Sequence, residues 1–230
     1  FSVGLLITLT FGMLNVTPMV LLPTMLQGLM GYPDDIIGLL LGARAVGTLV
    51  GFLVIFLGNR LDPRMWLVLG FGVQGVAGYM MAGFSLDVSA ADVAWASALQ
   101  GLGVGLLWVP ITLVAFSTLH ERYLPEGMAL FHLLRNIGSS LHVSISVAIV
   151  VHTAGVSYAE LGEHISPFSE TFQEAVGSGA YNVDTLSGVA RLSAEVERQA
   201  AMIGYLNGFY LYALTSLAVV PLIFLVRVRR

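Results

Sequence analysis

Two arginines lie deep inside long apolar stretches of the sequence. Arg44 is the only charged residue in 36–59, and Arg135 is the only Asp, Glu, Lys or Arg in 127–159. A guanidinium is expensive at membrane depth, so it is expected to face a bundle interior or a water-filled cavity and to mark a functional site. We interpret both arginines as part of a transport path or gate. The alternative of a structural arginine, hydrogen-bonded to carbonyl groups at a helix break, stays open.

The segments around the two arginines resemble one another. RAVGTL (44–49) and RNIGSS (135–140) share an arginine, an aliphatic residue, a glycine and a small hydroxyl residue at the same offsets. They fall in the second and fifth of six predicted helices, which are the middle helices of two triplets. Many secondary transporters are built from three-plus-three helices with inverted topology. The pattern therefore predicts two inverted three-helix repeats.

A stripe of polar residues surrounds the second arginine. At 100° per residue its members fall within about a third of the helix circumference, and they are His132, Arg135, Asn136, Ser139, His142 and Ser146. This alignment suggests an aqueous pathway in which histidine shuttles protons near neutral pH, although interhelical hydrogen bonds explain it equally well. Further polar candidates for the pathway are Asn15, Gln100 and Asn207.

The sequence lacks the signatures of catalysis, cofactor binding and nucleic-acid binding. It contains no HExxH, GxSxG or Walker-type motif and no GxGxxG at a strand–helix turn. Every acidic residue lies in a loop or at the end of an apolar stretch, there is no cysteine, and no basic cluster exists outside the last four residues. We therefore expect no enzyme, no cofactor, no metal site and no nucleic-acid partner.

The composition requires that much of the surface face lipid. Of the 230 residues 57% are hydrophobic and 10% are charged, and the mean hydropathy is +0.85; soluble domains carry about 25% charged residues. A membrane-crossing helix needs about 20 apolar residues. The apolar stretches do not alternate as barrel strands would, so an all-α, polytopic six-helix bundle is predicted, with spans near 3–27, 36–58, 65–84, 94–117, 128–153 and 200–226.

The distribution of arginine predicts the orientation of the bundle. The loops after the second and fourth spans contain Arg60, Arg64 and Arg122, and the tail contains three more arginines; the positive-inside rule therefore places both ends in the cytoplasm. The expected organisation is five transmembrane helices in 1–153, an extracytoplasmic loop with a short helix in 154–198, and a sixth helix with a basic tail in 199–230. An N-cap near 184–187 predicts that the last helix begins outside the membrane.

Several segments resemble a known family. LLPTMLQGLMGYPDDIIGLLLGARAVGTLVG (21–51), GNRLDPRMWLVLG (58–70) and QGLGVGLLWVPITLVAFSTLHERYLPEGMALFHLLRNIGSS (100–140) look like the C-terminal half of fourteen-helix drug/proton antiporters, the Emr-type multidrug exporters of the major facilitator superfamily. HISPFS (164–169) and ERQAAMIGYLNGFY (197–210) resemble the outer loop and last helix of that family. GNRLDPR is a degenerate form of the family's loop motif, in which Arg60, Asp62 and Arg64 are interpreted as a cytoplasmic latch.

This resemblance implies proton-driven efflux of hydrophobic or amphipathic drugs across the bacterial inner membrane by alternating access. It implies an N-terminal half that is absent from this chain and, in Gram-negative members, a periplasmic adaptor and an outer-membrane channel. Relatives often carry an acid in the last helix where this chain has Asn207, so carboxylate-based proton coupling would reside in the absent half. The alternatives left open are a facilitator or permease for a metabolite and a non-transporting membrane scaffold.

Overall fold

The protein is a bundle of long helices. The computed structural model describes residues 1–58, 62–164 and 185–224, and no strand occurs within those ranges. Six segments are long and apolar enough to cross a membrane, so the expected all-α, six-helix architecture is confirmed. The helices are α1 (Ser2–Met30), α2 (Asp34–Leu57), α3 (Pro63–Ala82), α4 (Ala90–Phe116), α5 (Leu124–His164) and α7 (Leu186–Ala218), with the short helices η1 (Glu121–Tyr123) and α8 (Val220–Phe224).

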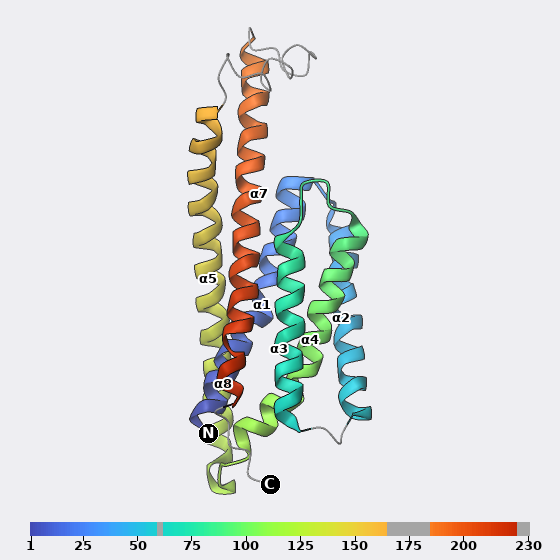
Figure 1. Ribbon diagram of the computed structural model, residues 1–230, viewed down its shortest axis with the longest axis vertical. Helices are drawn as coiled ribbons and strands as arrows, with labels where there is room; N and C mark the ends of the chain where they lie inside the picture. Colours follow the sequence, from blue (N-terminus) through green and yellow to red (C-terminus); the bar gives the residue numbers. More distant parts are fainter. Residues whose placement is uncertain (59–61, 165–184, 225–230) are drawn as a thin grey trace.

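Two helices extend well beyond their expected membrane spans. α5 has 41 residues and α7 has 33, whereas about 20 suffice to cross the hydrocarbon core. Their far ends project past the other helices on one side of the bundle (Figure 1). α7 begins at Leu186 with the Thr185 hydroxyl accepting from the Gly188 N–H, which confirms the expected start near 184–187.

α1 and α4 are the most buried of the membrane-capable helices, and they run in opposite directions (Figure 1). α2 packs mainly on α4, α5 packs on α1 and α7, and α3 lies against α4 and α7. As a result α2 and α5, which carry the two arginines, are the least buried of the membrane-capable helices. Each of them therefore has one face on a central helix and another face free of contacts within the described chain.

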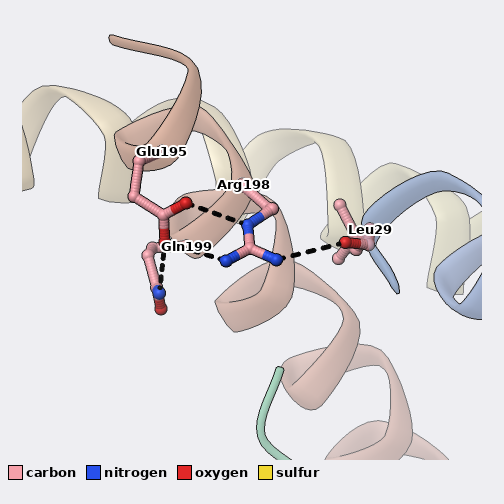
Figure 2. A network of polar contacts seen from close by, with 4 residues as sticks. All are labelled: Leu29, Glu195, Arg198 and Gln199. Carbon is pink, nitrogen blue, oxygen red and sulfur yellow. Dashed lines mark hydrogen bonds and ion pairs between the residues drawn. The ribbon is translucent and has the colours of Figure 1, made fainter. Parts of the chain in front are cut away.

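A charged network joins the projecting part of α7 to the end of α1. The Arg198 Nε and Nη2 groups donate to the two Glu195 carboxylate oxygens at 3.0 and 3.1 Å, and the Gln199 amide donates to Glu195 at 2.9 Å (Figure 2). Arg198 Nη1 also points to the Leu29 carbonyl at 3.5 Å (Figure 2). A cation beside the last carbonyls of a helix is favourable, so this network helps to hold α7 against α1.

Candidate functional site

Arg44 is held by α1 through neutral groups only. Its Nη2 group donates to the main-chain carbonyl of Asn15 at 2.9 Å and to Asn15 Oδ1 at 2.6 Å. Its Nε group is buried without a hydrogen-bond partner in the described part of the chain. Arg44 forms no ion pair with a carboxylate among the described residues. The ion pair found among them joins Glu195 to Arg198. The guanidinium is thus oriented but not neutralised.

The helix that carries Arg44 is fixed against α4 at the same level. The Thr48 hydroxyl donates to the carbonyl of Arg44 at 2.9 Å and to that of Gly101 at 3.1 Å. The Gly101 position allows the two backbones to approach so closely, because a Cβ atom there would overlap the Arg44 carbonyl oxygen. The Thr48 hydrogen bonds and the close backbone approach at Gly101 therefore fix the position of Arg44 beside α4.

Arg135 has an aromatic partner instead of an amide. Its guanidinium carbon lies 5.4 Å from the centroid of the Trp108 ring of α4, which is within the range of a cation–π interaction. Trp108 in turn packs edge-on against Phe11 of α1, with ring centroids 5.7 Å apart. The two arginines, although related in sequence, therefore have different partners: Arg44 is hydrogen-bonded to Asn15, whereas Arg135 lies over an aromatic ring.

The backbone contacts around the two arginines are nevertheless equivalent. Gly101 of α4 lies against the carbonyl of Arg44, and Gly12 of α1 lies in the same way against the carbonyl of Arg135. In each triplet the middle helix packs on the first helix of the other triplet. α1 and α4 run in opposite directions (Figure 1), so the relation is inverted, as the two similar segments predict.

The equivalence extends over a further turn of each helix pair. Gly47 follows Arg44 by three residues and lies against the carbonyl of Ala98, three residues before Gly101. Gly138 follows Arg135 by three residues and lies against the carbonyl of Leu9, three residues before Gly12. Both glycines are buried and a Cβ atom on either would overlap the facing oxygen. The Arg-x-x-Gly pattern thus marks a close helix crossing beside a half-buried arginine.

An apolar cavity adjoins Arg44. Its volume is about 510 Å³, and it is lined by Met19, Leu41, Arg44, Ala45, Thr48 and Leu49. Ligand pockets commonly measure about 300–1,000 Å³ and combine apolar walls with a few polar groups. The space beside Arg44 has this size and lining, but it is an open groove, because Met19 and Leu49 are more than half exposed.

The polar stripe on α5 does not face one common space. His142 is buried between helices: its Nδ1 atom lies 2.7 Å from the Thr17 hydroxyl of α1, and its Nε2 atom lies 3.3 Å from the Thr215 hydroxyl of α7. Ser146, also buried, lies 3.3 Å from Nδ1. In this conformation His142 therefore makes interhelical hydrogen bonds. This agrees with the alternative interpretation of the stripe and not with an aqueous pathway.

The remaining predicted pathway residues are dispersed. His132 and Asn136 are exposed on α5, and Asn207 is exposed on α7. Ser139 is half-buried, and its hydroxyl donates to the Asn136 carbonyl of its own helix. Gln100 is buried in α4. Of the predicted set, the structure joins Arg44 to Asn15 by hydrogen bonds, and none of these five residues is hydrogen-bonded to that pair within the described chain.

The predicted cytoplasmic latch is described only in part, because Arg60 lies outside the described residues. Asp62 is the N-cap of α3, where its carboxylate accepts from the Arg64 main-chain N–H at 3.0 Å. Pro63 occupies the first helical position, where a missing N–H is harmless. The Arg64 Nε group is buried without a hydrogen bond in this part of the chain. Capping is thus the role visible for Asp62.

Replacing Asp62 by alanine is expected to destabilise the protein by about 1 kcal/mol, the usual effect of losing an N-cap. Asp62→Asn is expected to retain most of the stability, since asparagine caps equally well. Thermal unfolding of the purified full-length protein in detergent measures both variants. Equal losses in the two variants would contradict capping and favour a charge-dependent latch.

Two residues near the arginines, Trp108 and Thr48, were absent from the pathway residues predicted from the sequence. Trp108 carries no local signal, because a cation–π partner on another helix requires knowledge of the helix packing. Thr48 does carry one, because a small hydroxyl follows Arg-x-x-Gly in both similar segments. The repeat therefore pointed to the seam between α2 and α4 but not to the groups that face each guanidinium.

Comparison with known proteins gives a match to one protein family and to several relatives. Residues 2–143 match the model of the Major Facilitator Superfamily. The chain is 24% identical over 231 residues to the fatty acid resistance protein FarB of Neisseria gonorrhoeae, and 26% identical over 230 residues to the multidrug export protein EmrB of Haemophilus influenzae. A further relative, the lincomycin resistance protein LmrB of Listeria monocytogenes, is 25% identical over 171 residues.

These relatives are much longer than the chain. The first two matches cover 99% and 97% of this chain but only 45% and 44% of FarB and EmrB. The match to LmrB covers 73% of this chain and 36% of that protein. The chain therefore spans less than half the length of these relatives.

Proposed function

Because the chain belongs to the Major Facilitator Superfamily, we propose that it forms the C-terminal half of a proton-coupled exporter of hydrophobic or amphipathic compounds. Its relatives include proteins named for multidrug export, fatty acid resistance and lincomycin resistance. In this proposal the bundle rocks against an N-terminal half around a site near the middle of the membrane. Arg44 and Arg135 belong to the transport path or its gate.

The observation that carries the proposal is the pair of arginines at equivalent helix crossings. Two cations inside a membrane bundle, neither of them in an ion pair among the described residues, are costly, and a passive scaffold has no need of them. α2 and α5, which carry these arginines, are also the least buried membrane-capable helices in the described chain. An N-terminal half seated on these two helices would enclose the arginines in a shared cavity.

We further propose that the transporter lies in the bacterial inner membrane with both ends of this chain in the cytoplasm. The N-terminus, the first residues of α3 and the α4–α5 connection lie at the same end of the bundle (Figure 1). Arg64 and Arg122 lie at that end, in keeping with the positive-inside rule. A periplasmic adaptor and an outer-membrane channel are the proposed partners if the source is Gram-negative.

Transport by the full-length protein in proteoliposomes tests this function. An imposed pH gradient is expected to drive accumulation of a substrate drug against its concentration gradient, with protons moving in the opposite direction. A protonophore is expected to abolish the accumulation, and empty liposomes give the background. Transport that ignores the pH gradient would indicate a facilitator, and a protein that moves neither drugs nor protons would favour a scaffold.

A further inference from the structure

His142 is a titratable side chain buried where three helices meet. Only 3% of its surface is exposed. On one side its Nδ1 atom lies 2.7 Å from the Thr17 hydroxyl of α1, and on the other its Nε2 atom lies 3.3 Å from the Thr215 hydroxyl of α7. The transport mechanism proposed above gives this histidine no part. Hydrogen bonds between helices alone do not require a group that changes its charge near neutral pH.

The hydroxyl on α1 identifies the nitrogen that can accept a proton. The Thr17 hydroxyl donates its one hydrogen to the Met13 carbonyl at 2.9 Å, so its oxygen accepts a hydrogen bond from Nδ1–H of His142. A neutral imidazole carries a single N–H group. Nε2 therefore has a free lone pair and is the atom to which a proton would add.

The hydroxyl on α7 can bond Nε2 in either protonation state. Thr215 lies 3.3 Å from Nε2 of His142 and 2.9 Å from the Leu211 carbonyl of its own helix. When the hydroxyl hydrogen points to Nε2, it donates to the lone pair of the neutral ring. When it points to Leu211, the hydroxyl oxygen accepts from a protonated Nε2. A proton can therefore add to Nε2 without leaving a polar group there unbonded.

The charge of a protonated ring would nevertheless be uncompensated between the packed helices. No Asp or Glu occurs in 2–30, 93–119, 127–159 or 199–224, which are the membrane parts of α5 and of the helices that pack on it. Tyr212 of α7 is a titratable neighbour, with its ring centroid 6.4 Å away, and Arg135, about two turns earlier on α5, adds a like charge. Since a buried charge without a partner is costly, this packing favours the neutral ring.

We propose that His142 is a proton-binding residue of the exporter: the ring is neutral while α5 packs on α1 and α7, and Nε2 takes up a proton from water when α5 moves away from them. A histidine in contact with water is readily protonated near neutral pH, whereas burial disfavours the charged form. Helix movement and the binding of one proton are thereby linked. This inference rests on the proposed export function and places a proton-binding group in this half of the transporter.

Deuterium exchange at the C2 carbon of histidine tests the inference, because that exchange proceeds through the protonated ring and requires water. The full-length protein in lipid nanodiscs is incubated in D2O buffers from about pH 5 to 8, the range in which histidine titrates, and each histidine is followed by mass spectrometry. His152, exposed on the same helix, is the reference. His142 is expected to exchange about tenfold or more slowly than His152, since only the opened fraction exchanges. No exchange at His142 while His152 exchanges would overturn the inference.

A second measurement asks whether the proton at His142 takes part in transport. Ethidium, a permanent cation, is the probe in proteoliposomes with an imposed pH gradient. His142→Gln is expected to reduce uphill ethidium accumulation severalfold while downhill movement persists, and His152→Gln is expected to behave as wild type. Accumulation by His142→Gln equal to that of wild type would overturn the inference and leave the proposed export function intact. Wild-type transport that ignores the pH gradient would instead refute the proton-coupled export on which the inference rests.

A further variant keeps the test valid if His142→Gln does not fold. Thr215→Val retains the histidine but removes the hydroxyl that donates to Nε2 in the packed, neutral state, so it is expected to speed deuterium exchange at His142 severalfold. Thr24→Val is the matched control, because that exposed hydroxyl donates only to carbonyls of its own helix. Equal exchange at His142 in Thr215→Val and Thr24→Val would contradict the role assigned to Nε2.

Discussion

Replacing Gly101 by valine is expected to eliminate most of the folded full-length protein. A Cβ atom at this position would overlap the carbonyl oxygen of Arg44 on α2, and a helix backbone cannot move aside as a flexible side chain does. Inserting even ordinary methylene groups into a packed core costs about 1–3 kcal/mol. Overlap with backbone is expected to exceed that range and to separate α2 from α4. Size-exclusion chromatography of a fluorescent fusion protein measures the folded fraction.

The inverted repeat supplies a second site for the same experiment. Gly12→Val is expected to have an equally large effect, because a Cβ atom there would overlap the carbonyl oxygen of Arg135. Gly72 of α3 is the matched control: nothing lies within 4 Å of the position of its Cβ atom, so valine there changes helix propensity alone. A normal yield of folded Gly101→Val protein, or an equal loss of folded protein in Gly72→Val, would contradict the close backbone packing of α2 on α4 and of α5 on α1.

Much of this architecture follows from the sequence because lipid imposes simple rules. A stretch such as 36–59 with one charge must be a membrane helix, and a lone arginine within it must turn inward. The similarity between RAVGTL and RNIGSS predicted an internal repeat, and the contacts of Gly47 with the Ala98 carbonyl and of Gly138 with the Leu9 carbonyl explain it physically. The glycine of each motif is needed where two backbones touch.

The partners of the polar side chains were less predictable. His142 and His132 share one face of an ideal helix, yet His142 is buried between α1 and α7 while His132 is exposed. His142 lies against Thr17 of α1 and Thr215 of α7, and a helical wheel of α5 alone does not contain these neighbours. Trp108 likewise reaches Arg135 through the packing of α4 on neighbouring helices. Such pairings depend on helix crossings that local periodicity does not encode.

Replacing Arg135 by alanine in the full-length protein is expected to abolish drug resistance while leaving membrane insertion intact. The substitution removes a cation from the proposed path and leaves the Trp108 ring without its partner, a contact worth about 0.5–2 kcal/mol. The Gly12 and Gly138 contacts with the neighbouring backbone remain, so the α1–α5 crossing is expected to persist. Growth of a strain lacking its own exporters, at increasing drug concentration, measures resistance, and immunoblotting of membranes measures insertion.

Two further variants separate the charge of Arg135 from its bulk. Arg135→Lys keeps a cation that can still lie over Trp108, although without the planar guanidinium, and is expected to restore part of the resistance. Arg135→Met keeps a long side chain without the charge and is expected to behave as alanine does. If methionine restored resistance, side-chain packing alone would account for Arg135, and the two arginines would no longer support a shared transport path. Normal resistance in Arg135→Ala would remove α5 from that path altogether.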